Sequence, residues 1–180
     1  MATTRARALE AAVELLGTAG LRALTHGRVD DRAGLPKGST SNFFRTRAAL
    51  LSGVVDWIVA QEMREVGDGV SPETVDEYAQ WMSRLVDVTT QQNRTMTTAR
   101  LVLFLEASHD PALREALARG RESMEAANVA LLRRLGARDP HTAAAAMMAC
   151  AEGVILHRIA RGADTDARAL FQQVAQGALA

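Results

Sequence analysis

Hydrogen-bonding side chains suited to recognition chemistry are concentrated between Thr25 and Arg47. The second half of this stretch holds hydroxyl, amide and ammonium groups and no acid: Lys37, Ser39, Thr40, Ser41 and Asn42. Such groups donate to phosphate oxygens and pair with the edges of nucleobases. The stretch is therefore a candidate surface for binding a nucleic acid.

Two short helices joined by a turn are predicted to carry these side chains. Thr25 is the expected N-cap of the first helix, because its hydroxyl can accept from free N–H groups of the first turn. Val29 and Ala33, four residues apart, give that helix a small apolar face. The Gly-Leu-Pro sequence at 34–36 ends it, since glycine adopts the left-handed conformation and proline cannot continue the hydrogen-bond ladder.

The second helix is predicted over 37–43, with its small polar residues outward and either Phe43 or Phe44 turned toward the core. A helix-turn-helix of this kind places its second helix in the DNA major groove. The same pattern fits a corner between two helices in any all-helical protein, so the motif alone leaves both interpretations open.

From Leu9 to Leu51 the chain resembles the N-terminal domain of TetR-family transcriptional regulators. The match runs through Gly20 and Leu24-Thr25 into the sequence VDDRAGLPKGSTSNFFRTR at 29–47. The family pattern there is A-x-x-A-G-V-x-x-G-T-L-Y-x-H-F-x-x-K-x-x-L. The resemblance implies an all-α fold, in which an N-terminal three-helix helix-turn-helix domain joins through a fourth helix to a larger helical domain for ligand binding and dimerisation.

The chain departs from the family pattern in three places. Ser41 stands where the family usually has a tyrosine that contacts phosphate, and Arg47 stands in place of a lysine. Val29-Asp30 replaces a common Ile-Ala pair. A guanidinium group at position 47 can still bind a phosphate, as a planar fork in place of a point charge.

The predicted DNA-binding residues divide by type and place. Thr25 and Arg47 stand at helix starts and are predicted to contact phosphates, whereas Arg28, Ser39 and Asn42 are placed to reach base edges. Lys37 and Ser41 fit either role. The full predicted set is Thr25, Arg28, Lys37, Gly38, Ser39, Ser41, Asn42, Phe43 and Arg47.

Charge is distributed unevenly along a chain whose net charge is zero. Residues 1–47 hold eight basic and four acidic side chains, and the remainder holds thirteen basic and seventeen acidic ones. A basic head on an acidic body is typical of a protein that contacts DNA at one end. Arg5 and Arg7 fit either phosphate contacts or a solvated terminus.

Catalytic and metal chemistry is not indicated by the sequence. The four histidines are scattered, the single cysteine excludes an internal disulfide, and no P-loop, nucleophile elbow or dinucleotide motif occurs. We predict no enzymatic activity, no metal and no cofactor. Because the opening residues are polar and no apolar run approaches the roughly 18 residues of a membrane span, we predict a soluble cytoplasmic protein.

Helix boundaries are predicted along the rest of the chain from caps and breakers. The first helix is predicted over 3–19, and the fourth runs from a Thr46 cap to about Val66, before Gly67-Asp68-Gly69. Later helices begin at Ser71-Pro72, Asp110-Pro111 and Asp139-Pro140, because proline lacks an N–H that the first helical turn would leave unused.

Two later segments are predicted to be helical on other grounds. The run at 101–105 is apolar all round, which predicts a helix buried on every side, although a buried strand also fits. The helix from Pro140 ends at Gly162, and a closing helix covers 166–179. We set the domain boundary at residue 46, with the DNA-binding domain at 1–46 and the regulatory domain at 47–180.

Aromatic residues and methionines in the predicted regulatory domain are candidates for an apolar ligand pocket with a few polar groups. The predicted pocket residues are Trp57, Tyr78, Trp81, Met82, Leu85, Arg100, Phe104 and Met147. The alternative for each of them is an ordinary place in the core.

The helix from Pro140 carries a broad face of alanine and glycine, which lets a second helix approach closely. The order of elements resembles the TetR-family body, where the last two long helices of each subunit form a four-helix dimer interface; an intrachain hairpin is the alternative. The predicted interface residues are Met124, Leu131, Met148, Ala151, Gly153 and Ile155.

Together these features predict a sequence-specific DNA-binding transcriptional regulator. We expect a homodimeric, ligand-responsive repressor that binds a near-palindromic operator in double-stranded DNA and releases it when a small apolar molecule binds. The alternative is a ligand-independent DNA-binding or architectural protein.

Overall fold

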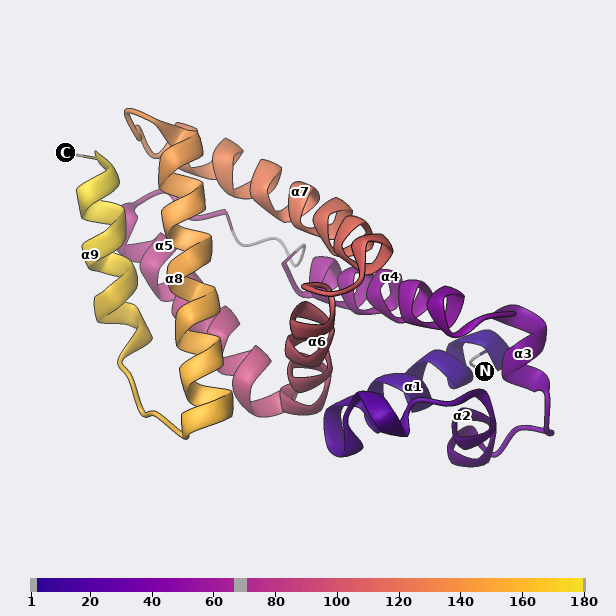
Figure 1. The fold of residues 1–180 in the computed structure, drawn as a ribbon. Coiled ribbons are helices and arrows are strands. Elements are labelled where there is room, and N and C mark those ends of the chain that lie inside the picture. The colour runs from indigo at the N-terminus through magenta and orange to yellow at the C-terminus, as the bar shows by residue number, and fades with distance from the viewer. Residues whose placement is uncertain (1–2, 67–70, 180) are drawn as a thin grey trace. The chain divides into compact units, whose positions relative to one another are not determined.

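The computed structural model describes residues 3–66 and 71–179, and within these ranges the chain is helical without strands (Figure 1). The elements are α1 (Thr4–Ala19), a short η1 (Leu21–Ala23), α2 (His26–Ala33), α3 (Ser39–Phe43), α4 (Arg47–Val66), α5 (Val75–Asp87), a π-helical turn η2 (Val88–Gln92), α6 (Arg94–Glu106), α7 (Pro111–Arg134), α8 (Pro140–Arg161) and α9 (Ala167–Leu179). The predicted all-α class is confirmed, and the run at 101–105 is helical.

The chain forms two compact units. Unit 1 comprises Met1–Glu62 and Arg94–Gly120, and unit 2 comprises Met63–Asn93 and Arg121–Ala180. Helices α4 and α7 each begin in unit 1 and end in unit 2. The predicted boundary at residue 46, between a DNA-binding and a regulatory domain, does not coincide with the division into compact units, and it stays a prediction.

Helix α1 supplies the centre of the unit 1 core. Its apolar stripe, which includes the fully buried Leu9 and Leu16, packs with residues of α4, α6 and the start of α7. Helix α6 lies against α1 so closely that a Cβ on Gly17 would stand 2.1 Å from the carbonyl oxygen of Thr95. The absence of a side chain at Gly17 therefore permits this helix contact.

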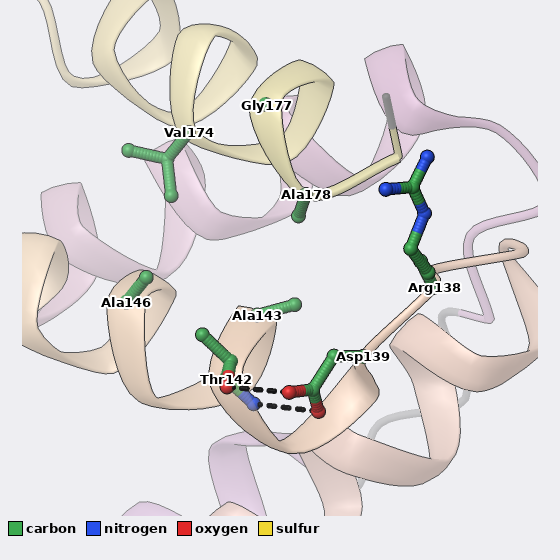
Figure 2. A pocket seen from close by; sticks show the side chains of 8 residues that line it. All are labelled: Arg138, Asp139, Thr142, Ala143, Ala146, Val174, Gly177 and Ala178. Atoms are coloured by element: carbon green, nitrogen blue, oxygen red, sulfur yellow. Dashed lines mark hydrogen bonds between the residues drawn. The ribbon is translucent and has the colours of Figure 1, made fainter.

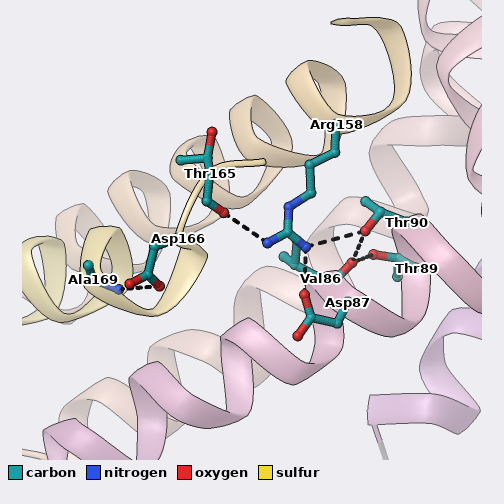
Figure 3. Close-up of polar contacts among 8 residues, drawn as sticks. All are labelled: Val86, Asp87, Thr89, Thr90, Arg158, Thr165, Asp166 and Ala169. Carbon is teal, nitrogen blue, oxygen red and sulfur yellow. Dashed lines mark hydrogen bonds and ion pairs between the residues drawn. The ribbon is translucent and has the colours of Figure 1, made fainter. Parts of the chain in front are cut away.

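The core of unit 2 is formed by α5, α8, α9 and the second half of α7. The Tyr78 ring is fully buried, and its hydroxyl donates to Asn128 Oδ1 on α7 at 2.8 Å. Figure 3 shows a polar clasp at the end of α8: Arg158 donates to Asp87 at 2.6 Å and to the Thr165 carbonyl at 2.9 Å. One guanidinium thus joins α8, the end of α5 and the α8–α9 connection.

Most predicted helix ends are confirmed because their caps are local. Thr46 accepts from the Ala49 N–H at the start of α4, and Asp110 accepts from the first turn of α7. Asp139 accepts from the His141 and Thr142 N–H groups, and Gly162 ends α8 in the left-handed conformation with φ of 63°. The predicted break at Gly67-Asp68-Gly69 lies outside the described residues.

The predicted helix start at Ser71-Pro72 is wrong. Helix α5 begins at Val75, where the Thr74 hydroxyl accepts from the Glu77 N–H at 3.2 Å. Ser71 serves another contact instead, because its hydroxyl accepts a 2.5 Å hydrogen bond from Arg134 of α7. Ser71 is therefore bonded to a residue 63 positions away in the chain and does not start the helix that the local cap–proline pattern predicted.

Helix α6 is not buried on every side, contrary to expectation. Leu103 is fully buried against the unit 1 core, whereas Phe104 is 37 % exposed and Leu105 is 76 % exposed. The buried residues of the helix are Thr97, Ala99 and Leu103. The apolar side chains of Phe104 and Leu105 are left open to solvent within the chain.

Helix α8 also differs from expectation, since by length and composition it is the one described helix that could cross a membrane. The helix has 22 residues; its most apolar 18-residue stretch has a mean hydropathy of 1.4, and 33 % of that stretch is buried within the chain. A single such helix is weak evidence for a membrane span, because helices that pack inside soluble proteins share these properties. Exposed apolar residues gathered on one helix indicate a surface that binds another molecule.

The close contact between α1 and α6 predicts a steric effect at Gly17. Gly17→Ala should lower the free energy of unfolding by about 1–3 kcal/mol, because the added methyl group meets backbone, which cannot move aside cheaply. Gly27→Ala is the matched control: a Cβ there meets nothing within 4 Å, so the gain in helix propensity should stabilise by roughly 0.5–1 kcal/mol. Urea unfolding followed by circular dichroism measures both; equal effects of the two substitutions would contradict this account.

Candidate nucleic-acid interface

Local sequence signals position the two helices of the candidate interface. The Thr25 hydroxyl accepts from the Arg28 N–H at 3.3 Å and caps α2 as predicted. Gly34 ends α2 in the left-handed conformation, also as predicted. Helix α3 begins at Ser39, two residues later than expected, because Gly38 has a φ of +88° and belongs to the turn. Glycine is required at position 38 by this backbone conformation.

A buried carboxylate joins α2 to α3. Asp30 Oδ2 accepts from the Gly38 N–H at 2.8 Å, while Oδ1 accepts from the Thr40 N–H at 2.8 Å and from the Thr40 hydroxyl at 2.5 Å. Burial by itself raises the pKa of this carboxyl, but the hydrogen bonds from Thr40 and Gly38, with the nearby His26, outweigh burial and leave the pKa below its ordinary value. Asp30 is therefore held as a carboxylate inside the motif.

The end of α3 and the end of α2 are held by further polar contacts. His26 Nε2 lies 2.6 Å from the carbonyl oxygen of Phe44, so in this contact the ring nitrogen donates. Phe44 is the phenylalanine that enters the core, and the Arg5 guanidinium lies 5.4 Å from its ring centroid. Arg7 donates to the Ala33 carbonyl at 2.6 Å. Arg5 and Arg7 thus have structural contacts in addition to any role toward phosphates.

The outer face of this motif carries the predicted DNA-binding side chains. Ser39 is half-buried and donates to the Pro36 carbonyl at 2.6 Å, and Arg47 donates to the Leu21 carbonyl at 3.4 Å. The Phe43 ring is 47 % exposed, which is unusual for phenylalanine. The remaining members of the set are exposed on the same segment: Thr25, Arg28, Lys37, Gly38, Ser41 and Asn42. A short rigid helix with hydroxyl, amide and aromatic groups outward has the chemistry to contact phosphates, base edges and thymine methyl groups.

The predicted pocket residues of unit 2 lie mostly in its core. Tyr78, Met82 and Met147 are buried, and Leu85 is half-buried. Trp81 is half-buried and stacks on Tyr78, with ring centroids 6.1 Å apart. In the structure of this chain these residues make ordinary core contacts.

One of the predicted pocket residues of unit 1, Arg100, forms an ion pair. Arg100 Nε lies 3.2 Å from Glu62 Oε1, and both side chains are largely buried. The Arg100 guanidinium also lies 5.3 Å from the Phe104 ring centroid. Trp57 is half-buried against the unit 1 core. A carboxylate that the sequence analysis did not single out, Glu62, is therefore the partner of a predicted ligand-binding arginine.

A pocket of about 310 Å³ lies elsewhere, in unit 2. Figure 2 shows it between the start of α8 and the end of α9, near the Asp139 cap. None of the predicted ligand-binding residues lines it; its walls are Arg138, Asp139, Thr142, Ala143, Ala146, Val174, Gly177 and Ala178. Its small apolar side chains suit the packing of another helix better than the specific binding of a polar molecule.

The predicted dimer residues differ in their exposure within the chain. Met148 and Ile155 are already buried in the chain, whereas Met124, Leu131 and Ala151 are half-buried. Gly153 is half-buried, and a Cβ there would meet nothing within 4 Å. The exposed face of α8 is instead formed by Ala145, Ala146, Ala149, Leu156, His157 and Ala160.

The buried polar residues of the motif were missed as functional candidates by sequence reasoning. The sequence did contain a sign that Asp30 is unusual, because the family pattern has an apolar residue where this chain has a carboxylate. Thr40 and His26 had none, since their partners become visible only when α2 and α3 are folded against each other.

Comparisons with known proteins agree with this architecture. The family described as "Tetracyclin repressor-like, C-terminal domain" matches residues 73–180. No curated protein sequence matches the chain.

Solved structures are similar over nearly the whole chain. The multidrug binding protein EbrR complexed with ethidium is 26 % identical with a TM-score of 0.77, and the match covers 96 % of this chain and 98 % of that one. A member of the TetR family from Streptomyces coelicolor is 25 % identical with a TM-score of 0.79 over 96 % and 98 % of the two chains. A Rhodococcus transcriptional regulator, 16 % identical, has a TM-score of 0.84 over 98 % and 96 % and shows the fold alone.

The motif at the start of the chain, the helical body behind it and these matches lead to one conclusion. The chain belongs to the TetR family of transcriptional regulators, which bind DNA and small molecules and are not enzymes.

Proposed function

We propose that this protein is a ligand-responsive repressor, which binds a near-palindromic operator as a homodimer and releases it when a small apolar molecule binds. The observation that supports it most is the α2–turn–α3 motif, whose internal polar contacts leave Ser41, Asn42 and Phe43 exposed on one short helix. A polar and aromatic surface with no internal partner to pack against suits a nucleic-acid groove. We place the protein in the cytoplasm.

Phosphate and base contacts are assigned to different parts of the motif. Arg47 stands at the start of α4 and Thr25 at the start of α2, where backbone N–H groups favour an anion, so we assign both residues to phosphates. Asn42 lies on the exposed side of α3 and can pair bidentately with adenine. Arg28 and Ser39 are assigned to base edges, with Ser39 limited by its bond to Pro36.

The two kinds of contact should separate in binding measurements. Arg47→Ala should weaken binding to operator and to random DNA about equally and reduce the salt slope by about one unit, because a lost phosphate contact carries no sequence information. Asn42→Ala should cost about 1–3 kcal/mol on the operator and little on random DNA. Fluorescence anisotropy at several salt concentrations measures both. An unchanged operator-to-random ratio in Asn42→Ala would exclude base reading by Asn42.

Dimerisation is proposed through the exposed face of α8 and the neighbouring α9. Leu156 is 47 % exposed on α8, a helix whose most apolar stretch is only 33 % buried within the chain. The adjacent alanine-lined pocket between α8 and α9 could receive side chains from a second copy. Symmetric pairing of this surface with itself would cover the apolar residues of both subunits.

A charge placed on this face should dissociate the dimer. Leu156→Arg should raise the dimer dissociation constant by roughly a hundredfold or more, because the charge would be buried without a partner. Leu105→Arg is the matched control: Leu105 is 76 % exposed on α6, outside the proposed interface, so the dimer should persist. Sedimentation at micromolar concentration distinguishes the two variants. A wild-type monomer, in solution and on DNA, would contradict the homodimer.

The effector is proposed to be a small, mainly apolar molecule. EbrR structures carry ethidium and proflavin, both flat aromatic dyes, and at 26 % identity this supports testing the same chemical class here. A ligand can shift operator affinity only if its affinity differs between the DNA-bound and the free conformation. We propose α4 as the connecting element, because it begins directly after the motif and continues into the second compact unit.

Ethidium and proflavin should raise the melting temperature of the protein in the absence of DNA. Because both dyes also intercalate into DNA, they should lower its operator affinity at dye concentrations that leave an unrelated DNA-binding protein bound to its own site. The chain has two tryptophans, Trp57 in unit 1 and Trp81 in unit 2. Trp57→Phe and Trp81→Phe therefore leave one reporter each, and quenching on dye binding in one of the two variants would identify the unit that binds the dye. Saturating dye with an unchanged operator dissociation constant would argue for the ligand-independent alternative.

A further inference from the structure

The helix-turn-helix contains two polar side chains that are withdrawn from solvent. Asp30 is 1 % exposed and Thr40 is fully buried. Neither can contact DNA directly. They are hydrogen-bonded to each other across the turn, and the Gly38 N–H completes the set of donors to the carboxylate.

A buried carboxylate is costly unless its oxygens are satisfied by donors in good geometry. Here three donors at 2.5 to 2.8 Å converge on one side chain, two of them backbone N–H groups at the start of α3. Charge-assisted bonds of this kind are short and directional. The carboxylate therefore specifies both the position and the orientation of the first residues of α3.

Helix α3 depends on such support because it is short. Its five residues are far fewer than an isolated helix needs for stability in water. Its preceding residue, Gly38, has no side chain with which to cap the helix. Asp30 supplies from α2 the cap that the turn itself lacks.

We propose that Asp30 is a positioning residue for sequence reading, which holds the recognition helix in the orientation that brings Asn42 and its neighbours to the base edges. This inference rests on the proposed DNA-binding function. Because Asp30 occupies the Gly38 and Thr40 N–H groups, these groups are withheld from DNA phosphates. Asp30 thus contributes to the affinity for the operator sequence. The attraction to DNA phosphates, which does not depend on sequence, comes from residues such as Arg47.

The test compares two duplexes, one selected by the wild-type protein from random sequences and one unselected duplex of equal length. Asp30→Ala should lower affinity for the selected duplex by at least roughly tenfold, the scale of one lost base contact, and leave the unselected duplex unchanged within about threefold. Asp30→Asn retains one acceptor oxygen and should give an intermediate loss. Thr40→Val, which removes only the hydroxyl, should also lose selectivity, to a smaller extent.

Asp31→Ala is the matched control, because Asp31 is the neighbouring acid and is exposed. It removes the same charge near the DNA without removing a bond to α3. It should leave the selected-to-unselected ratio unchanged, with both affinities equal to or slightly tighter than those of the wild type. A ratio lowered equally by Asp31→Ala and Asp30→Ala would overturn the positioning role in favour of a simple charge effect.

Amide hydrogen exchange provides the readout of position. In Asp30→Ala and Asp30→Asn, the Gly38 and Thr40 amides should exchange faster while amides of α1 stay protected, which shows that the unit remains folded. Wild-type selectivity retained in full by Asp30→Ala would overturn this inference alone. A wild-type protein that prefers no selected duplex would overturn the proposed DNA reading as well, so the two failures are distinguishable.

Discussion

The burial of the α1 apolar stripe is the interaction on which unit 1 depends. Leu9 and Leu16 lie at the centre of a core to which α4, α6 and the start of α7 all contribute. The side of α1 that carries Gly17 approaches the α6 backbone closely enough to exclude any side chain. The same helix contacts α2 and α3. Helix α1 is therefore the element of unit 1 that contacts both α6 and the helices of the DNA-binding motif.

The helix-turn-helix motif, which packs on α1, is held by polar contacts in addition to the apolar contacts of Val29 and Phe44. The Asp30 carboxylate joins the start of α3, and the His26 ring joins its end through the Phe44 carbonyl. Directional bonds restrict orientation more tightly than apolar packing of such small side chains. This arrangement suits a surface that recognises the positions of base edges in DNA. It leaves the side chains of Ser41, Asn42 and Phe43 on α3 exposed.

Unit 2 has a different physical problem, which is excess apolar surface. The Tyr78–Asn128 bond and the Arg158 clasp hold α5, α7, α8 and α9 around a complete core. Yet Leu156 and the alanines beside it remain exposed on α8. The hydrophobic effect favours removing such a face from water, and a second copy of the chain would do so in the homodimer proposed above. The hydropathy that would admit α8 to a membrane is, in this proposal, the signature of a subunit interface.

The sequence by itself determined the all-helical fold, the helix-turn-helix and most helix ends, because caps such as Thr25 and Asp139 and breakers such as Gly34 act within a few residues. Tertiary structure decided the rest. Ser71 accepts a hydrogen bond from Arg134 of α7 instead of starting a helix, and the exposure of Phe104 depends on which face of α6 meets α1. The partners of Asp30 appear only when α2 folds onto α3. Each of these outcomes depends on contacts between residues that are separated in the sequence, and a local sequence pattern does not predict such contacts.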